Sequence, residues 1–343
     1  MPEINLMRVP NFGIDGFVTF KEKNNMSFRP SATHTTDSIA YSNALSELLE
    51  ERDMNNYVPV EMRGEANAEF YRNLEIIGDT NWYNLEKQYV ELINFNDPSD
   101  TVYFPKELVL FKSHYDLHDK NQLHWSSSEG YSHDTNKITA LNKGKSEIIE
   151  HHTKMFWWFG WSKIIEKIRM KSSVFDKLKK QKIIKSVRVF EILESNQFSY
   201  STIMAVLETT AFPFLSVGFG TNTDEKNAMD HALLEAIHTF RGENWYNLSQ
   251  AMIPNEFRKD FWNRVKHSLL NDRSKIAKIK NTSLQPTFYY LIVGDRSKGF
   301  TTRVYSPDLQ PLISNQFVPF YFHELCTNEN IALREKYRGT PFI

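Results

Sequence analysis

Two segments of this chain, SELLEERD at residues 46–53 and SEIIEHHT at residues 146–153, share the pattern Ser-Glu-apolar-apolar-Glu. In each segment the glutamates are three positions apart, so both carboxylates lie on one face of an α-helix. Two like charges held side by side repel each other unless a cation or a proton lies between them. The apolar pair inside each segment indicates that both helices also pack against a core. The pattern therefore predicts two acidic helices that carry either a solvated stripe or the ligands of a cation.

A third predicted helix, residues 221–242, carries His231, Glu235 and His238 at spacings that place all three on one face. Three helices that each bring carboxylates or imidazoles predict a site for a hard cation. Carboxylate oxygens suit Mg²⁺, which binds them together with waters and substrate phosphates. The candidate metal ligands are Glu47, Glu50, Glu147, Glu150 and Glu235.

Composition narrows the class of protein. The 41 basic residues nearly balance the 42 acidic ones, so the overall charge favours neither nucleic acid nor a membrane surface as partner. The single cysteine, Cys326, excludes an internal disulfide and a cysteine-based zinc cluster. The sequence has neither a signal-peptide pattern nor an apolar run of about 18 residues that would span a bilayer. We therefore expect a cytoplasmic globular protein.

The predicted secondary structure is mixed. Helical patterns occupy residues 35–53, 134–159 and 221–242, and residues 163–188, rich in Lys and Arg, are interpreted as a solvated helix face. The aromatic run FWWFGW at residues 156–161 is interpreted as a core or subunit-contact cluster. Strand-like stretches lie at residues 16–20, 101–111, 187–193, 200–208, 212–220, 287–294 and 300–307. Because strands and helices do not alternate strictly, the sequence predicts an α+β fold in a single domain spanning residues 1–343.

Two other constellations compete with the magnesium hypothesis. HYDLHD at residues 114–119 has metal-capable spacing but no second cluster beside it. EAIH at residues 235–238 is half of the signature of a di-iron carboxylate bundle, which needs two such motifs. The other acidic helices carry Glu-x-x-Glu instead, so a di-metal oxidase is the weaker hypothesis. The chain contains no G-x-S-x-G elbow, Walker A motif or Rossmann fingerprint.

Together with their lead-in segments, the three acidic helices resemble the YcaO superfamily. The segment NALSELLEER at residues 43–52 is similar to the family's first motif, and residues 127–152 are similar to the second, which holds Glu147 and Glu150. The third motif, a G-x-G lead-in followed by an acidic helix, is matched at residues 218–238. TTRVYSP at residues 301–307 looks like the family's strand with an Arg before a Pro. The resemblance runs from about residue 27 to residue 307 and leaves a tail at residues 327–343.

Several positions depart from the family pattern while the glutamates are kept. Asn43 replaces a Ser, Glu129 replaces an Asn, and histidines replace two Arg and one Gln. The resemblance implies that ATP and Mg²⁺ are the cofactors and that the three acidic helices line a nucleotide cavity. The residues that it implies for binding the nucleotide are Asn43, Glu129, His151, His231, His238 and Arg303.

The resemblance also implies a reaction. Similar enzymes phosphorylate a backbone amide oxygen of a ribosomally synthesised peptide, after a Cys, Ser or Thr has attacked the amide carbon. Loss of phosphate leaves an azoline, the ring that precedes a thiazole or oxazole. In azoline-forming members a proline-rich C-terminus enters the active site, which makes Pro341, Phe342 and Ile343 the candidate catalytic residues. Thioamide or amidine formation, and a catalytically silent scaffold subunit, remain alternatives.

The expected partners follow from the same resemblance. They are a precursor peptide and a separate leader-peptide-binding protein, and the family also admits a homodimer. Neither nucleic acid nor a membrane is expected as a partner.

Overall fold

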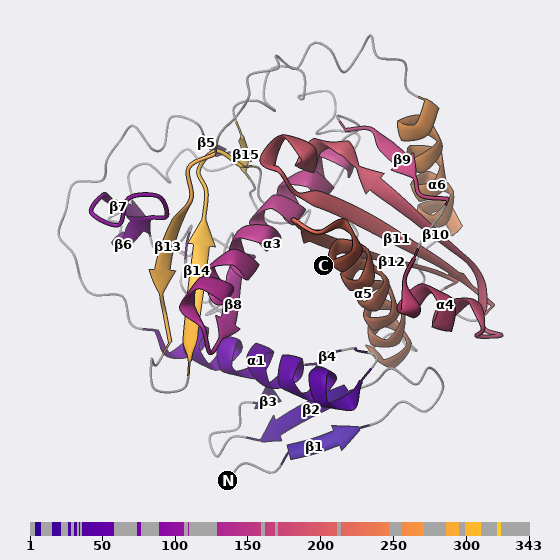
Figure 1. The fold of residues 1–343 in the computed structure, drawn as a ribbon, viewed down its shortest axis with the longest axis horizontal. Helices are drawn as coiled ribbons and strands as arrows, with labels where there is room; N and C mark the ends of the chain where they lie inside the picture. Colours follow the sequence, from indigo (N-terminus) through magenta and orange to yellow (C-terminus); the bar gives the residue numbers. More distant parts are fainter. Residues whose placement is uncertain are drawn as a thin grey trace. The chain divides into compact units, whose positions relative to one another are not determined.

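The fold is described here from a computed structural model (Figure 1). The structure describes residues 4–7, 16–21, 27–28, 31–32, 34, 36–57, 74–76, 89–105, 109, 129–158, 162–168, 171–210, 214–246, 255–270, 286–294, 299–309 and 321–323. Its helices and antiparallel sheets confirm the α+β class. Contacts divide the chain into two units, the first comprising residues 1–48 and 156–283 and the second residues 49–155 and 284–343. The single domain over residues 1–343 stays a prediction.

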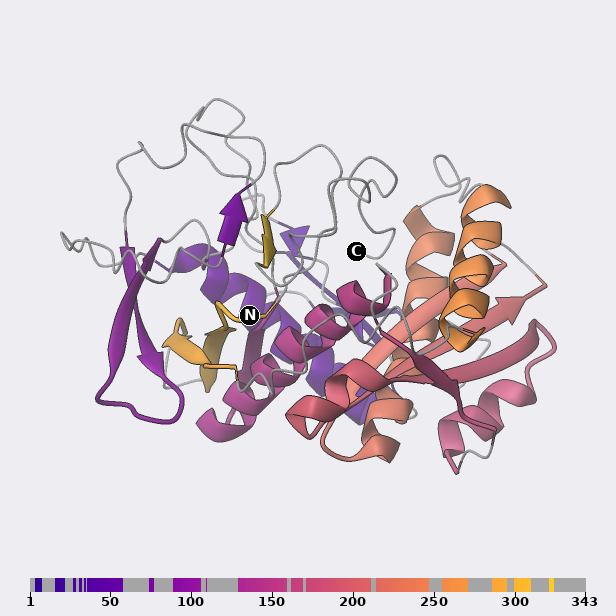
Figure 2. The same ribbon diagram turned by 90° about the horizontal axis from the view of Figure 1, so that it is seen from above.

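The first unit contains a four-stranded antiparallel sheet in the order β12-β11-β10-β9. Helix α5 lies along this sheet in Figure 1, and Figure 2 shows the same strands after a turn of 90°. The elements are β9 (Ile164–Glu166), α4 (Ser173–Lys179), β10 (Ile184–Ile192), a 3₁₀-helix η3 (Leu193–Phe198), β11 (Ser201–Thr209), β12 (Leu215–Asn222), α5 (Glu225–Tyr246) and α6 (Asn255–Leu270).

Two glycines of β12 allow α5 to approach the sheet closely. A Cβ atom at Gly218 would lie 2.1 Å from the backbone nitrogen of Ala236, and one at Gly220 would lie 2.3 Å from the carbonyl oxygen of Ala228. The alanines of α5 face these glycines and are fully buried. The G-x-G lead-in of the third motif is therefore a packing requirement, which fixes the helix that carries Glu235.

The opposite face of the same sheet is closed by aromatic side chains. Trp157 is 1% exposed and contacts Phe219 of β12 and Phe261 of α6, at ring-centroid distances of 6.2 Å and 5.7 Å. Phe156 and Trp158 are also buried. The described part of the aromatic run, residues 156–158, thus confirms the predicted core cluster.

The first unit also holds a small antiparallel sheet and the beginning of helix α1 (Asp37–Asn56). Ala44 of this helix is fully buried and packs against Ala32, Tyr41, Leu45 and Leu48. The strands are β1 (Ile4–Met7), β2 (Gly16–Lys21), β3 (Ser27–Phe28) and β4 (Ser31–Ala32).

The second unit is built on a five-stranded antiparallel sheet in the order β7-β6-β13-β14-β8. It also contains the end of α1, most of helix α3 (Lys137–Trp158) and a two-stranded pair. The strands are β6 (Tyr89–Asn94), β7 (Thr101–Pro105), β8 (Tyr131–Asp134), β13 (Tyr289–Ile292) and β14 (Phe300–Tyr305), with β5 (Leu74–Ile76) paired to β15 (Tyr321–His323).

The structure corrects one interpretation and adds elements. Residues 163–188 were interpreted as a helix face, but they form β9, α4 and the start of β10. The interpretation was wrong because the isoleucines of this segment belong to a strand at the sheet edge, where Ile164 pairs with Ile192. Helix α6 and several strands, including β6 and β8, were not predicted. No helix among the described residues is long and apolar enough to cross a bilayer.

Candidate functional site

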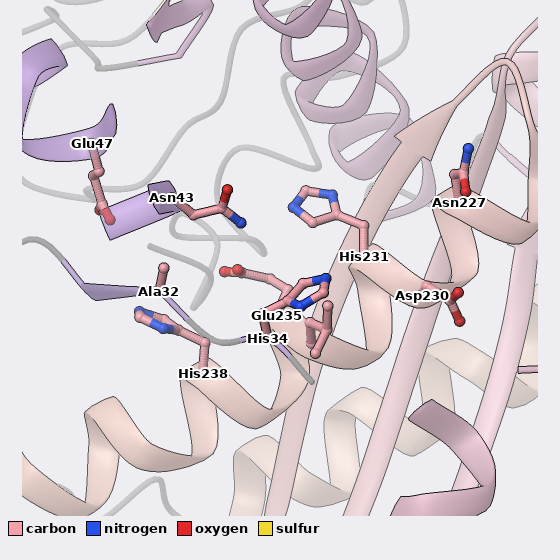
Figure 3. Close-up of a pocket in the computed structure, with 10 residues that line it drawn as sticks. Ala32, His34, Asn43, Glu47, Asn227, Asp230, His231, Glu235 and His238 are labelled. Carbon is pink, nitrogen blue, oxygen red and sulfur yellow. The ribbon is translucent and has the colours of Figure 1, made fainter. Parts of the chain in front are cut away.

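A polar pocket of about 570 Å³ lies within the first unit. Figure 3 shows Asn43 and Glu47 projecting from α1 on one side, and His231, Glu235 and His238 projecting from α5 on the other. These five residues were predicted as cofactor or metal ligands, and the structure brings them to one pocket. The other lining residues are Ala32, His34, Asn227, Asp230 and Leu234.

The pocket face of α5 follows from the helical repeat. Its alanines and leucines pack on the sheet, so the residues in between turn outward. His231 is exposed, whereas Glu235 and His238 are partly buried. Asn227, Asp230 and Leu234 lie on the same face of α5, at spacings of three and four residues. The helical repeat that placed His231, Glu235 and His238 on this face would also have identified these three residues.

His34 is a pocket residue that sequence reasoning missed. It lies in the segment RPSATH at residues 29–34, which precedes the first acidic helix and carries no motif of its own. Burial lowers the pKa of His34, while the nearby carboxylate of Asp230 acts in the opposite direction. The Ser172 hydroxyl donates a hydrogen bond to Asp230, which orients that carboxylate.

A second candidate group lies within the second unit and is acidic. Burial raises the pKa of Glu147 well above its ordinary value, and the neighbouring carboxylates of Glu50 and Glu150 raise it further. Burial, followed by repulsion from Glu51, raises the pKa of Glu50 to about 8. The raised pKa values of Glu50 and Glu147 favour their protonated forms, and a divalent cation would compete with those protons.

Arg303 of β14 is a buried cation of this acidic group, and Lys143 also lowers the pKa of Glu50. Its side chain is 2% exposed, its Nε donates to the carbonyl oxygen of Val109 at 2.9 Å, and its guanidinium lies 5.0 Å from the ring centroid of Tyr131. The positive charge of Arg303 opposes the upward pKa shifts of Glu50 and Glu147.

One nitrogen of this guanidinium lacks an acceptor. Among the described residues, no atom accepts a hydrogen bond from the buried Nη1 of Arg303. A buried donor without an acceptor is costly, so this nitrogen favours binding of an anionic oxygen such as that of a phosphate. Gly130, at φ +75°, leaves the space beside Nη1, because a Cβ atom there would lie 2.9 Å from it.

Two of the substituted positions contact each other. The Nδ1 of His151 lies 2.8 Å from the Glu129 carboxylate, and both side chains are largely buried. The predicted nucleotide-binding residues Glu129, His151 and Arg303 therefore belong to the same unit as Glu50, Glu147 and Glu150.

The donor set fits a magnesium–nucleotide complex better than a protein-only metal site. Within the described ranges, no group of three or more His, Cys, Asp or Glu side chains is arranged to hold a metal ion alone. Mg²⁺ commonly takes one or two carboxylates and completes its shell with waters and phosphates. The five-glutamate ligand set stays a prediction.

Two sequence hypotheses fall on residues that the structure does not describe. HYDLHD at residues 114–119 lies outside the described residues, as do Pro341, Phe342 and Ile343 of the predicted tail. Their proposed metal-binding and catalytic roles therefore remain predictions.

Comparison with protein families gives a match over more than half of the chain. The model of the YcaO family, described as cyclodehydratases that bind ATP and Mg²⁺, matches residues 79–269. No curated protein of similar sequence was found.

Solved structures share the fold. YcaO from Methanopyrus kandleri, bound with AMPPCP and Mg²⁺, aligns with a TM-score of 0.62 and 16% identity over 90% of this chain and 86% of that one. A chain of the E. coli microcin synthetase McbBCD complex with pro-MccB17 bound aligns with a TM-score of 0.66 and 14% identity, over 98% of this chain and 95% of that one. A heterocyclase in complex with substrate and cofactor aligns with a TM-score of 0.65 and 12% identity, over 91% of this chain and 50% of that one. The YcaO-like α+β fold predicted from the sequence is thus confirmed.

Proposed function

This chain belongs to the YcaO family of ATP- and Mg²⁺-binding cyclodehydratases, and we propose that it uses ATP to activate backbone amides of a ribosomally synthesised peptide. The product we propose is an azoline formed at a Cys, Ser or Thr of that peptide. The observation that carries the proposal is the buried Nη1 of Arg303, which has no acceptor among the described residues and belongs to the same unit as Glu50 and Glu147, whose pKa values are raised.

ATP, when bound, supplies the phosphoryl group that turns the amide oxygen into a leaving group. The side chain of the peptide first adds to the amide carbon, and the oxygen then leaves with the phosphate, so one water is lost per ring. The chain's own contribution is positioning and charge stabilisation rather than a nucleophile.

We propose distinct roles for the residues. Glu47, Glu50, Glu147, Glu150 and Glu235 bind the Mg²⁺ ions of ATP. Arg303 donates to a phosphate oxygen through its Nη1, and the remaining nucleotide contacts come from Asn43, Glu129, His151, His231 and His238. Pro341, Phe342 and Ile343 are proposed as catalytic by resemblance to azoline-forming relatives. Each group is supported by its residue chemistry and by the family match.

We propose the precursor peptide and a leader-peptide-binding protein as partners in the cytoplasm, with a homodimer as the further assembly. The fold likeness to a chain of the McbBCD complex with pro-MccB17 bound supports this proposal. Neither nucleic acid nor a membrane is proposed as a partner.

A catalytically silent scaffold is the second candidate, and a specific observation favours it. Glu129 and His151 replace an Asn and an Arg of the family pattern, and they contact each other at 2.8 Å. This replacement removes positive charge from residues that would otherwise bind phosphate, which weakens nucleotide binding.

Co-expression of the full chain with a precursor peptide and the leader-peptide-binding protein tests the proposal. Mass spectrometry of the peptide is expected to show loss of one water per modified residue, and this loss is expected to require Mg²⁺ and ATP. An unmodified peptide, with no ATP turnover by the complete complex, would favour the scaffold. Replacement of the amide oxygen by sulfur would instead indicate thioamide chemistry. An amidine forms from an amine with the same loss of water, so fragmentation of the peptide must place the modification at a Cys, Ser or Thr to support an azoline.

A further inference from the structure

A buried chain of hydrogen bonds links α1 to β14 and β8 in the second unit. The Thr301 hydroxyl lies 2.5 Å from Oδ2 of Asp53, and Nδ1 of His133 lies 2.8 Å from the same hydroxyl. Thr301 and His133 are directly paired across β14 and β8. The other oxygen of Asp53 accepts from the guanidinium of Arg52. All three linked side chains are at most 7% exposed.

The proton positions in this chain are fixed by chemistry. A carboxylate of Asp53 can only accept, so the single hydroxyl proton of Thr301 points toward it. The hydroxyl oxygen then accepts from His133, whose Nδ1 must carry the ring proton. Burial lowers the pKa of His133, which keeps the ring neutral and leaves one N–H for this bond. Each group thus orients the next.

Two glycines of the β13–β14 connection leave room for the hydrogen-bonded side chains of Asp53, Thr301 and His133. A Cβ atom at Gly294 would lie 2.2 Å from Oδ2 of Asp53 and 2.6 Å from the Thr301 hydroxyl. Gly299, at φ +120°, would place a Cβ atom 2.8 Å from Nε2 of His133. Larger residues at either position would displace the hydrogen-bonded groups, so the local sequence is built around them.

The hydrogen-bonded residues lie next to the acidic group, one helical turn away along α1 and two residues away along β14. Asp53 follows Glu50 by three positions on α1, and Arg303 follows Thr301 by two on β14, so each pair shares a face of its element. Arg303 acts electrostatically on Glu50, which places these two groups near one another. The Asp53–Thr301 bond and the Glu50–Arg303 pair are therefore consecutive links between one helix and one strand.

We infer that Asp53, Thr301 and His133 form a latch that fixes α1 against β14 and thereby positions Glu50 beside Arg303 for the Mg²⁺ of bound ATP. This inference rests on the proposed function, in which Glu50 binds Mg²⁺. The three residues are positioning residues, since they act through Glu50. The Thr301 hydroxyl lies between the imidazole of His133 and the carboxylate of Asp53 and forms a hydrogen bond with each. Removal of this hydroxyl alone is therefore enough to break both bonds.

The test compares Thr301→Val with Thr302→Val in the full chain. Thr302 is equally buried on the same strand, but its hydroxyl lies 3.2 Å from that of Ser132. The first measurement is hydrogen exchange of the α1 amides at residues 50–54 without nucleotide. The second is the Mg²⁺ concentration that half-saturates ATP binding. Thr301→Val is expected to speed exchange and to raise the half-saturating Mg²⁺ concentration about tenfold, whereas Thr302→Val leaves both near wild type.

Further variants keep the outcome decisive. Thr301→Ser retains the hydroxyl and is expected to restore both measurements; failure to do so would overturn the latch. If Thr301→Val does not fold, Asp53→Leu, which removes the acceptor at similar volume, replaces it with the same expectations, and wild-type behaviour of Asp53→Leu would overturn the latch. Equal effects of the two valine variants would also overturn it. Faster exchange in Thr301→Val, with no Mg²⁺–ATP binding by the wild type, would uphold the link between α1 and β14 and refute the proposed function.

Discussion

The two candidate groups differ in how their charges are held. The pocket of the first unit is lined by three histidines, two asparagines and three carboxylates that are exposed or partly buried, and burial lowers the pKa of His34. The acidic group of the second unit holds carboxylates whose pKa values are raised by burial and by one another, beside a buried arginine. A cation bound in the second unit would favour the ionised form of the carboxylates of Glu50 and Glu147. We therefore expect substitutions in the second unit to have the larger effects.

The largest expected effect is that of Glu147→Gln. The substitution keeps the size of the side chain but removes charge from the centre of the acidic group, so ATP turnover is expected to fall on the order of 100-fold or more. Thermal unfolding should show an intact fold. Glu91→Gln, at an exposed position of β6, is the matched control and is expected to keep wild-type turnover. Equal turnover in both variants would show that the acidic group has no role in ATP use.

Arg303→Met is expected to have the next largest effect. The variant keeps an apolar stem but removes the donor that would bind a phosphate oxygen, so ATP affinity should fall by about 10- to 100-fold. Loss of the positive charge should also raise the pKa of Glu50 further. Calorimetric titration with ATP and Mg²⁺ measures the affinity, and unchanged affinity would contradict the assigned phosphate contact.

The third prediction concerns pH in the absence of Mg²⁺ and nucleotide. The pKa of Glu50 is about 8 in the folded chain and near its ordinary value of 4.5 when unfolded. Between these values the folded chain holds a proton that the unfolded chain has released, so the free energy of unfolding falls as pH rises. The slope from this group is about 1.4 kcal/mol per pH unit.

Glu50→Gln should flatten that part of the profile, which denaturation at pH 5 to 8 would reveal. Added Mg²⁺ should bind more tightly as pH rises through the same range, because it competes with protons. A wild-type profile no steeper than that of the variant would contradict the raised pKa.

The smallest effect is expected from His231→Arg in the pocket of the first unit. The variant restores the residue type of the family pattern and adds a permanent charge at an exposed position. ATP affinity is expected to rise only about two- to fivefold, since exposed charges are screened by solvent. In the wild type, affinity should weaken as pH rises through the imidazole range, and this trend should be smaller in the variant. An effect as large as that of Arg303→Met would erase the distinction between the two groups.

The sequence alone determined the acidic helices and several of their partners. The Glu-x-x-Glu spacing, the apolar pairs between the glutamates and the outward stripe of α5 depend only on the helical repeat, so residues within one helix could be placed on a common face. Helical spacing alone placed His231, Glu235 and His238 on one face and Glu47 on another helix, whereas Asn43 was identified by the resemblance to the YcaO motifs; the structure brings all five to one pocket. The strand β9 was missed because the short segment of residues 163–168, in which isoleucines stand among charged residues, fits both a helix face and an edge strand.

Only the tertiary structure decided which residues meet across distant parts of the chain. Asp53 and Thr301 are separated by 248 positions, and although each lies at one end of a segment singled out in the sequence, nothing in either segment indicates that the two residues meet. Gly294 leaves the space beside these two residues and Gly299 leaves the space beside His133, and neither set of neighbours is evident from the sequence. The raised pKa of Glu147 likewise depends on burial and on Glu50 of another helix. Local periodicity fixes the face on which a side chain lies, whereas packing fixes its neighbours, its hydration and hence its charge.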